Sequence, residues 1–453
     1  MTRKYHSVAL IPEGVWGQTV ASLIFDPKRH PDYSKVPEKL TMYSWRDHRA
    51  KDLERIINDP SAYQDPFSPE FNPEENFAYF NWGNPDIKAD IKVYSPLSTI
   101  ERHIDRISEE AGLGEKYRAI LQAVYDSDLI ILAPRSSELM EYVSALNKIY
   151  SSAAMQDKSP DVLCLTKGIF VDDEGTAKVP YEIIEEGLPK RMRKAIMVGP
   201  NISSEIRLYL PATSVVATKH SPRRRFLREL SELLSGYHFR PVWSKHPNAL
   251  GWATAVKNVV AIGVGIGNSY IEDTLKNMTE LSEEQIKNGS YNSNLLGEIV
   301  TLGMRDGWHA FNHLLNRHGR WSKVRPEEYL LSFGALGDTI TTADSENSRN
   351  VRFGYHFGKE LIKNPHADRE ALIEDVVQEK IKQAVEGIPT ARDLQKLIKT
   401  HKLQVPFFEG VSEMLFGDLT PDVFVEKMFE TAGRYETYDD RILSRLFGRR
   451  DVK

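Results

Sequence analysis

The sequence predicts two domains of different class: an α/β domain with a doubly wound, mostly parallel sheet over residues 1–245, and an all-α domain over residues 246–453. Three observations predict this organisation. In the first part, short apolar segments alternate with helical ones, which is typical of a parallel sheet covered by helices. After about Lys245 only helical spacing remains. A chain of 453 residues is also longer than one ordinary domain.

Composition excludes several classes of protein. The chain has 59 Lys and Arg against 64 Asp and Glu, a formal net charge of −5, which argues against nucleic acid as its main partner. Cys164 is the only cysteine, so an intramolecular disulfide is excluded. Residues 1–6 are polar and lack the apolar core of a signal peptide, and the apolar segments are short or broken. We therefore expect a cytoplasmic protein without a membrane span.

The first predicted strand, residues 6–11, leads through a glycine-containing turn into an apolar helix. This order is the context of a dinucleotide-binding fingerprint, in which the second glycine admits the pyrophosphate and the third lets helix and strand pack closely. Gly14 and Gly17 match these two positions, whereas Pro12 stands at the first. Glu13 places an acid beside the expected pyrophosphate unless its side chain points away. In isolation the stretch fits a plain strand-to-helix turn equally well.

The second predicted strand, residues 40–45, ends in a group of charged residues. In a nicotinamide-binding fold this end meets the adenosine ribose. Asp47 could accept a hydrogen bond from a 2′-hydroxyl, whereas Arg46 or Arg49 could pair with a 2′-phosphate. The alternative is that all three are solvated loop charges. The sequence therefore leaves NAD and NADP equally open.

Residues 59–115 interrupt the regular pattern. The part from 59 to 94 is rich in Pro, Asn and Phe and has no clean period, so we interpret it as an inserted surface excursion. It would pack against its own domain, act as a lid or contact a second subunit.

Later strands are predicted at residues 129–134, 161–165, 195–198, 212–218 and 239–243. Ligands of such sheets bind beyond the carboxyl ends of the strands. The turns at Pro134, Lys167–Gly168 and 199–205 follow three of these ends, so we expect them to converge on one crevice.

Helical spacing in the second domain predicts helices over residues 248–264, 295–317, 351–363, 373–386, 391–400 and 420–430. The first contains Lys257 and Asn258 within an apolar run, residues 255–265. A lysine among valines loses hydration, and this cost falls on its charged form. Either its amine reaches the surface, or it has a lowered pKa and transfers protons in a dry site.

Two other segments of this domain are not ordinary connectors. Residues 334–342 carry Asp338 between glycines and threonines, and residues 348–354 place Arg349 and Asn350 at a helix start. Guanidinium and free backbone N–H groups at a helix start make an anion site, although a plain N-cap with solvated arginines is the alternative.

A histidine pair is the only candidate metal site. His309 and His313 are four apart on a predicted helix, with His318 beyond. Such a pair can bind zinc, but the glutamate of the metalloprotease pattern is missing and no acidic third ligand is evident. We therefore expect no metal.

Taken in order, these segments resemble the NAD(P)-dependent glycerol-3-phosphate dehydrogenase family. That family's fingerprint ends in Gly-x-Trp-Gly, as Gly14, Trp16 and Gly17 do here. The other matching segments are Lys167–Ile169, Gly199–Glu205, Ala255–Gly265, Gly337–Asp338, Ser348–Gly354 and Val385–Gly387. The resemblance covers nearly the whole chain apart from residues 59–115.

The resemblance implies a Rossmann-like domain followed by a helical domain of the 6-phosphogluconate dehydrogenase C-terminal type. It implies hydride transfer between NAD or NADP and C2 of a small phosphorylated substrate, interconverting sn-glycerol 3-phosphate and dihydroxyacetone phosphate. It also implies a homodimer and a place in glycerol-3-phosphate metabolism and phospholipid biosynthesis.

Site residues carried over from the matching positions fall into three groups. Lys257 would be the acid/base, with Lys167 lowering its pKa by like-charge repulsion if it lies nearby, and Asp338 offsetting part of that effect. Arg349 and Asn350 would bind the substrate phosphate. The remaining candidates are Asn258 and Thr342 for the rest of the substrate, and Gly14, Trp16, Gly17, Arg46, Ser203, Arg349 and Glu386 for the cofactor.

Several positions depart from the family pattern: Pro12, the turn Ala133–Ser136, Val351 where a basic residue is common, and the insertion. These departures keep two alternatives open. One is a related dehydrogenase that acts on another phosphorylated or acidic ketone or alcohol. The other is a non-catalytic nucleotide-binding homologue.

Overall fold

The computed structural model describes residues 5–29, 36–65, 80–219, 223–278, 282, 293–316, 324–345 and 347–437. The chain forms two compact units: Met1–Phe170 with Lys178–Gly251, and Val171–Ala177 with Trp252–Lys453. The division thus falls six residues beyond the expected boundary at residue 245. Val171–Ala177 belongs to the helical unit, where Lys396 Nζ donates to the Asp172 carbonyl at 2.6 Å and a ring nitrogen of His401 lies 2.9 Å from the Gly175 carbonyl.

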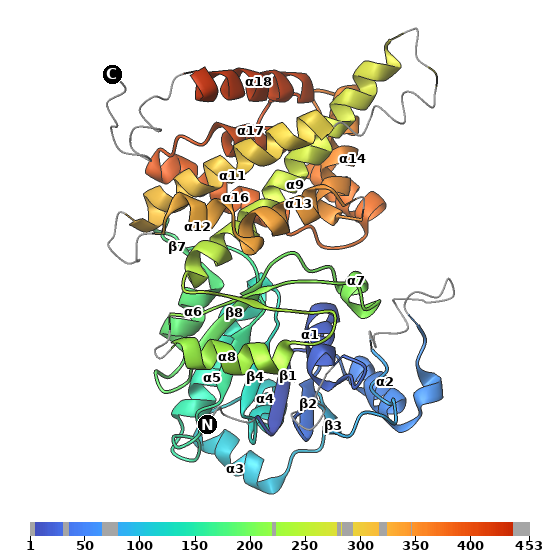
Figure 1. The fold of residues 1–453 in the computed structure, drawn as a ribbon, viewed down its shortest axis with the longest axis vertical. Helices are drawn as coiled ribbons and strands as arrows, with labels where there is room; N and C mark the ends of the chain where they lie inside the picture. Colours follow the sequence, from blue (N-terminus) through green and yellow to red (C-terminus); the bar gives the residue numbers. More distant parts are fainter. Residues whose placement is uncertain are drawn as a thin grey trace. The chain divides into compact units, whose positions relative to one another are not determined.

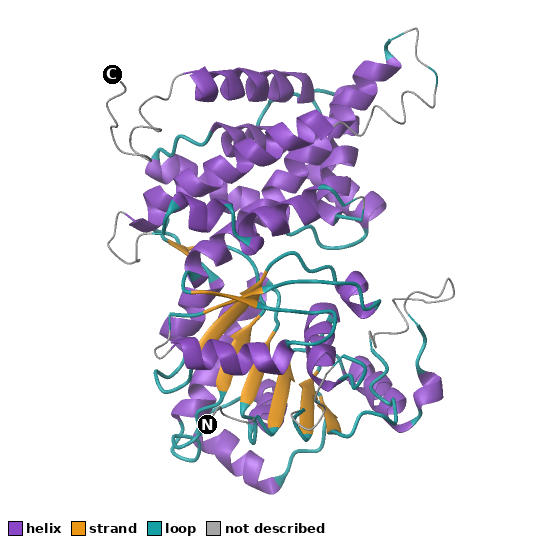
Figure 2. Ribbon diagram, in the orientation of Figure 1, coloured by secondary structure: helices purple, strands orange, loops and turns teal. Residues whose placement is uncertain are grey.

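A single large sheet forms the centre of the N-terminal unit, and the described residues contribute eight strands to it (Figures 1 and 2). In spatial order they are β10 (Val242–Ser244), β9 (Val215–Ala217), β8 (Lys194–Val198), β5 (Asp161–Cys164), β4 (Leu129–Leu132), β1 (Ser7–Ile11), β2 (Lys39–Tyr43) and β3 (Asp90–Tyr94). Neighbouring strands are parallel except β8 and β9, which pair antiparallel. The prediction of a mostly parallel, doubly wound sheet is confirmed.

The order β3-β2-β1-β4-β5-β8 is that of a Rossmann fold, in which a dinucleotide binds where the strand order reverses. Here the reversal lies between β1 and β4, whose residues Val8 and Leu129 are paired in register. The fingerprint turn after β1 and the Pro134 turn after β4 therefore flank the expected cofactor position.

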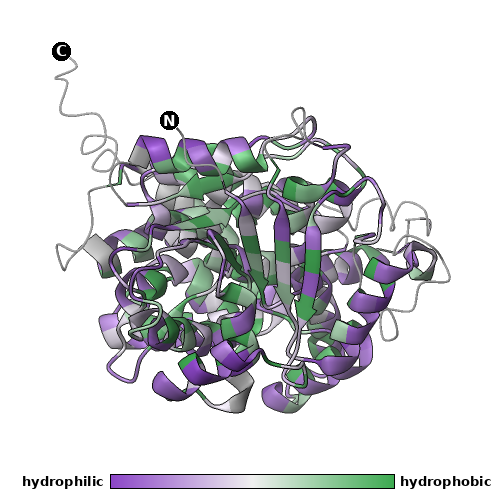
Figure 3. Cartoon of the chain, turned by 90° about the horizontal axis from the view of Figure 1, so that it is seen from below, coloured by the Kyte–Doolittle hydropathy of each residue, from purple (hydrophilic) through white to green (hydrophobic). Residues whose placement is uncertain are grey.

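Helices cover both faces of this sheet because side chains of a strand alternate between faces. Val8 and Leu10 pack with α1 (Val15–Phe25), α2 (Asp47–Asn58), α7 (Ser203–Arg207) and α8 (Arg223–Leu234). Ala9 and Ile11 pack with α3 (Arg102–Glu110), α4 (Glu115–Val124), α5 (Leu139–Ser151) and α6 (Pro180–Gly187). Figure 3 colours each residue by its hydropathy. The helices at the rim of the view carry hydrophilic residues, drawn in purple, on their outward-facing turns. The short elements η2 (Pro60–Ala62) and η3 (Ser136–Glu138) complete the unit, while β6 (Phe170–Val171) and β7 (Ala177–Lys178) straddle its division from the helical unit.

The interpretation of residues 59–94 as a surface excursion is wrong for its described end. β3 extends the sheet by pairing along its length with β2, and Trp82 is buried. A Cβ on Gly83 would lie 2.0 Å from the Ile56 carbonyl oxygen, so this turn packs directly on α2. β3 was not predicted because it is an edge strand. Its sequence, Asp-Ile-Lys-Val-Tyr, alternates polar and apolar residues instead of forming an apolar run. Residues 66–79 lie outside the described residues.

The C-terminal unit is helical, as predicted. Its long helices are α9 (Pro247–Lys276), α11 (Ser293–Asn316), α14 (Arg349–Lys363), α16 (Gly387–His401), α17 (Pro406–Phe416) and α18 (Pro421–Thr437). Shorter helices are α12 (Pro326–Leu330), η4 (Phe333–Gly337), α13 (Asp338–Ala343), α15 (Arg369–Asp375) and η5 (Val376–Ile381). Among the described residues, only α9 is long and apolar enough to cross a membrane, and its apolar window is entirely buried inside the protein.

Two helix predictions in this unit need correction, and one long helix was missed. α9 continues twelve residues beyond Val264, and Gly265 and Gly267 within it lie where neighbouring helices pack closely. The helix predicted over 373–386 begins at Arg369, where the Asp368 side chain caps Ala371 N, and its π-helical continuation η5 is terminated at Lys382 by a left-handed conformation with φ of 56°. α17 was not predicted.

Glycines bring α9 and α14 into backbone contact. A Cβ on Gly265 would lie 2.1 Å from the Val351 carbonyl oxygen, and one on Gly354 would lie 2.1 Å from the Ile262 carbonyl oxygen. Any side chain at either position would force the helices apart. This crossing sets the distance between Asn258 on α9 and the first turn of α14.

Candidate active site

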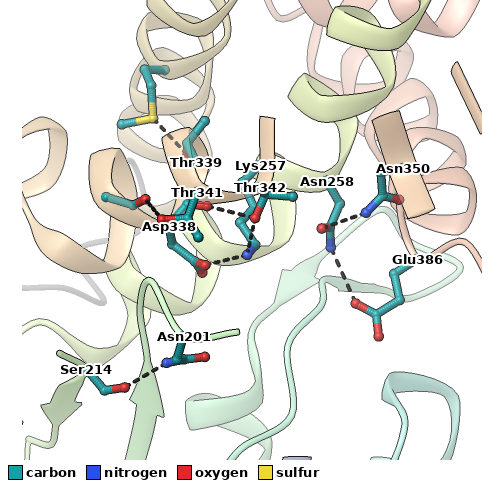
Figure 4. A network of polar contacts seen from close by, with 12 residues as sticks. Asn201, Ser214, Lys257, Asn258, Asp338, Thr339, Thr341, Thr342, Asn350 and Glu386 are labelled. Carbon is teal, nitrogen blue, oxygen red and sulfur yellow. Dashed lines mark hydrogen bonds and ion pairs between the residues drawn. The ribbon is translucent and has the colours of Figure 1, made fainter. Parts of the chain in front are cut away.

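The predicted acid/base lysine is buried against two groups of α13. Lys257 Nζ lies 2.5 Å from Asp338 Oδ1 and 2.7 Å from Thr342 Oγ1 (Figure 4). The side chains of Lys257 and Asp338 are 8% and 3% exposed. Burying a lone ammonium is costly, and a carboxylate at this distance offsets the cost. The Lys257 amine therefore does not reach the surface, which rejects the first alternative, and its role in proton transfer stays a prediction.

Asp338 and Thr342 are positioned by the start of α13. The helix begins at Asp338 after the π-helical turn η4, and residues four apart share one helix face. Thr342 Oγ1 donates to the Asp338 carbonyl at 2.8 Å, so its oxygen accepts the bond from Lys257. This pattern fixes the threonine rotamer and makes it an acceptor towards the lysine.

Asn258, the residue after Lys257, belongs to a second polar group (Figure 4). Asn350 Nδ2 donates to Asn258 Oδ1 at 3.0 Å, and Asn350 Oδ1 accepts from Gly387 N at 3.0 Å. Asn258 Nδ2 lies 3.5 Å from Glu386 Oε2. Because Gly387 N is a donor, it fixes the orientation of the Asn350 amide and, through it, that of Asn258. Gly387 had no role in the sequence interpretation, although it ends a matching segment.

The start of α14 carries the expected anion-binding groups. Ser348 is the N-cap and accepts from Val351 N at 3.4 Å. Arg349 is exposed and donates through Nη1 to the Ala384 carbonyl at 3.0 Å, while Arg352 Nη2 donates to the Lys380 carbonyl at 3.3 Å. A guanidinium has five N–H donors, so these single bonds orient each arginine without using its capacity for an anion.

The fingerprint turn of the N-terminal unit has open space at Gly14 and close packing at Gly17. Gly14 is the N-cap of α1, and a Cβ there would meet nothing within 4 Å. A Cβ on Gly17 would lie 2.7 Å from a methyl carbon of Leu10, so only glycine lets α1 approach β1 this closely. Trp16 Nε1 is buried and has no hydrogen-bond partner among the described residues. The α1 N-terminus with this donor fits the pyrophosphate of a dinucleotide.

Glu13 turns away from this helix start, towards the end of β2. Its carboxylate accepts from Ser44 Oγ at 2.9 Å and lies 3.9 Å from Arg49 Nη1. Burial raises the pKa of Glu13, while Arg49 and the hydrogen bonds oppose this shift. The Glu13 carboxylate therefore does not point towards the expected pyrophosphate position at the α1 N-terminus.

Arg46 and Asp47 at the end of β2 have different surroundings. The Arg46 guanidinium lies 4.3 Å from the Trp45 ring centroid. Asp47 accepts from Leu97 N at 3.0 Å, and a hydrogen bond with Ser95 lowers the pKa of Asp47. Asp47 is therefore bonded to the segment after β3, while Arg46 stays beside the expected ribose position.

The turns after β5 and β8 both depend on left-handed glycines. Gly168 and Gly199 have φ of 139° and 140°, which side-chain-bearing residues rarely adopt. Lys167 precedes the first of these glycines and is half-buried. Ser203 is the first residue of α7, and Asn201 Nδ2 before it donates to Ser214 Oγ at 2.7 Å.

These residues belong to different units. Lys167, Ser203, Arg46 and the fingerprint turn lie in the N-terminal unit, while Lys257, Asp338, Arg349 and Glu386 lie in the helical one. The structure brings together Lys257, Asp338 and Thr342, and separately Asn258, Asn350 and Glu386.

The histidine pair on α11 is not part of a group of metal-binding side chains in the described part of the chain. His309 and His313 lie on α11, and His318 falls outside the described residues. Within the described part of the chain, no group of three or more His, Cys, Asp or Glu side chains is placed to hold a metal ion.

Sequence comparisons match both units to one family. The model of the NAD-dependent glycerol-3-phosphate dehydrogenase N-terminus matches residues 113–223, and that of its C-terminus matches residues 249–426. The chain belongs to the NAD(P)-dependent glycerol-3-phosphate dehydrogenase family. The matched C-terminal region contains Lys257, Asp338, Arg349 and Glu386, whereas the fingerprint turn precedes the matched N-terminal region.

Individual members of the family are distant relatives. The glycerol-3-phosphate dehydrogenase [NAD(P)+] of Oceanobacillus iheyensis is 24% identical over 72% of this chain and 80% of that protein. The enzyme of the same name from Brucella canis is 27% identical over 71% and 82%. The glycerol-3-phosphate dehydrogenase structure from Coxiella burnetii has a TM-score of 0.61 at 19% identity, covering 94% of this chain and 100% of that one. At that identity the likeness shows a shared fold.

Proposed function

We propose that this protein interconverts sn-glycerol 3-phosphate and dihydroxyacetone phosphate by hydride transfer with NAD or NADP, using Lys257 as the acid/base. The observation that carries the proposal is the buried contact of Lys257 with Asp338 and Thr342. Family membership supports the reaction class and the cofactor.

The chemistry of the alcohol–ketone pair requires one proton transfer and one hydride transfer. When bound, the nicotinamide supplies or accepts the hydride at C2 of the substrate. Reduction of the ketone needs an acid beside the carbonyl oxygen, and oxidation of the alcohol needs a base beside the hydroxyl. The Lys257 ammonium donates that proton in one direction, and the amine accepts it in the other. Asp338 balances the charge and Thr342 holds the lysine chain.

Substrate binding would use the start of α14. Arg349 pairs with the phosphate, and the backbone N–H groups of the helix start add to the attraction. Asn350 stays a predicted phosphate contact, and its hydrogen bond also holds the neighbouring Asn258 amide. A fixed phosphate holds C2 in place and lowers the entropic cost of reaction.

Cofactor residues are proposed from matching positions and local geometry. Gly14, Trp16 and Gly17 at the α1 start would hold the pyrophosphate, and Arg46 the adenosine ribose end. The other proposed contacts are Ser203, Arg349 and Glu386. Lys167 stays a prediction as the second catalytic lysine.

The direct test is oxidation of NADH and NADPH by the purified protein with dihydroxyacetone phosphate, followed by absorbance. We expect substrate-dependent oxidation with at least one cofactor. Absence of oxidation with both cofactors, from a folded sample, contradicts the proposal. Comparing the two cofactors also resolves the NAD or NADP preference.

A second candidate is a dehydrogenase for another phosphorylated or acidic ketone or alcohol. Val351, in the first turn of α14, stands where the family commonly has a basic residue and favours this alternative. A substrate panel decides between them, because the proposal requires dihydroxyacetone phosphate to have the highest kcat/KM. A non-catalytic homologue is distinguished by cofactor binding without turnover of any substrate.

Family membership also supports a cytoplasmic homodimer with a place in phospholipid biosynthesis. Size-exclusion chromatography with light scattering tests the dimer, because a dimer has twice the 51.7 kDa mass of the chain.

A further inference from the structure

A buried set of side-chain hydrogen bonds, the Glu13 network, joins Trp82 to the dinucleotide-binding turn. Trp82 Nε1 donates to Gln18 Oε1 at 3.0 Å, and Gln18 Nε2 donates to Glu13 Oε2 at 3.3 Å. The other carboxylate oxygen of Glu13 accepts from Ser44 Oγ at 2.9 Å and lies 3.9 Å from Arg49 Nη1.

The network is almost fully shielded from water. Trp82, Gln18 and Glu13 are 2%, 0% and 5% exposed. A buried polar group that loses its hydrogen-bond partner is still removed from water, so the loss of one bond is costly. In a connected set, the loss of one bond also weakens the neighbouring bonds. The network therefore holds its members in one arrangement.

These members come from the places that would contact a dinucleotide. Glu13 lies in the turn between β1 and α1, next to Gly14. Ser44 and Arg49 lie at the end of β2 and in the first turn of α2, where a Rossmann fold receives the adenosine ribose. Trp82 lies in the segment before β3, which no expected cofactor contact includes.

The direction of the hydrogen bonds gives Trp82 a specific task. An indole N–H can only donate, so Gln18 must present its oxygen to Trp82 and its NH₂ group to Glu13. Without the indole donor, the Gln18 amide loses the bond that fixes its orientation beside Glu13. The Glu13 carboxylate would then be held less firmly relative to Ser44 and Arg49.

We propose that Trp82 and Gln18 are positioning residues for cofactor binding, acting through Glu13 on the dinucleotide-binding turn and the end of β2. This inference rests on the cofactor-binding part of the proposed function. It gives the inserted segment around residue 82 a role in holding the cofactor site in shape.

The test measures the Kd of NADH and of NADPH for Trp82→Phe by titration calorimetry. Phenylalanine keeps one aromatic ring and removes the donor together with part of the buried ring volume, and the control described below loses the same volume. Loss of one buried hydrogen bond predicts an affinity weakened by about threefold to tenfold. The kcat and the KM for dihydroxyacetone phosphate stay near the wild-type values, because the change acts on the cofactor alone.

The matched control is Trp252→Phe. Trp252 is equally buried and donates through its indole N–H to the Gly307 carbonyl at 2.9 Å in the helical unit. It should lose comparable thermal stability and leave both cofactor Kd values within twofold of wild type. A Trp82→Phe protein that loses stability without losing affinity contradicts the inference.

A second variant tests the route through Gln18. Gln18→Met removes the amide and should weaken cofactor binding by itself, so it also serves if Trp82→Phe does not fold. In the Gln18→Met background, Trp82→Phe should cause no further change in Kd. Additive effects, or an unchanged Kd for Gln18→Met, overturn the inference. A wild-type protein that binds neither NADH nor NADPH instead overturns the proposed function.

Discussion

The ammonium nitrogen of Lys257 lies 2.5 Å from a carboxylate oxygen of Asp338, although the two residues are 81 positions apart in the chain. Both side chains are buried, so each compensates the desolvation of the other. Removing one partner therefore has two separable effects, one on the reaction and one on stability.

Lys257→Met should lower kcat by about 10²–10⁴-fold, the usual contribution of a general acid or base. It should also lower the free energy of unfolding by about 3–5 kcal/mol, because Asp338 is left buried without its cation. In Lys257→Met/Asp338→Asn we expect most of the stability to return and the activity to stay lost. Urea unfolding and steady-state kinetics measure the two effects. Lys276→Met, at the exposed end of the same helix, is the control, and activity surviving in Lys257→Met rejects the acid/base assignment.

Arg349→Met should raise the KM for dihydroxyacetone phosphate by about 10- to 100-fold, as expected for a lost charge-assisted bond. The kcat at saturating substrate should change far less. Initial rates over a wide substrate range give both constants. Lys363→Met, at the other end of α14, should leave KM unaltered because its ion pair with Glu360 is exposed. An unaltered KM in Arg349→Met removes this residue from the phosphate site.

Gly354→Ala should destabilise the helical unit by more than about 2 kcal/mol, because its Cβ would lie 2.1 Å from the Ile262 carbonyl oxygen. Moving α14 also displaces Arg349 and Asn350, so KM should rise in parallel. Gly297→Ala on α11 is the matched substitution, since its Cβ meets nothing within 4 Å. There the higher helix propensity of alanine should stabilise the protein by about 0.5–1 kcal/mol. Chemical denaturation measures the free energy of unfolding, which should fall in Gly354→Ala and rise in Gly297→Ala. Equal changes in the two variants would contradict the close crossing of α9 and α14.

Stability should depend on pH through Asp306. Burial raises the pKa of Asp306 to about 8 from a model-peptide value near 3.8, although its carboxyl accepts from Phe407 N at 2.7 Å. A raised pKa in the folded state means that the stabilising contribution is complete below the unfolded pKa. It is lost as the pH rises towards 8. We therefore expect the free energy of unfolding to fall between about pH 4 and pH 8 through this group. Asp306→Asn should flatten the dependence, and an unchanged profile in that variant excludes Asp306 as the cause.

Much of the fold was predictable because its strongest signals are local. β1, β4, β5 and β8 are buried on both faces and are correspondingly apolar runs in the sequence. β3 carries no such signal, since an edge strand needs apolar residues on one face only. The sequence prediction ended α9 at Val264, whereas the helix continues through Gly265, which permits a close helix crossing.

The candidate site residues were proposed from the sequence one by one, but most of their hydrogen bonds were not. Lys257, Asp338 and Asn350 were proposed from matching segments, and Asp338 was expected beside the lysine. The contact of Lys257 with Thr342 followed only from the structure. The orientation of Asn350 depends on a backbone N–H of Gly387, which no side-chain pattern reveals. The bond from Trp82 to Gln18 likewise joins residues 64 positions apart without a sequence signal.

Cys164 lies in the middle of the sheet on β5, and burial raises the pKa of its thiol to about 11. The thiol is therefore both protonated and inaccessible in the native protein at neutral pH, and it reacts with a thiol reagent only after the surrounding strands separate. Because it is the sole cysteine in the sequence, each modified molecule records one opening of this sheet. The unmodified protein thus contains its own probe for the rate at which the nucleotide-binding unit opens, and saturating cofactor should slow that labelling.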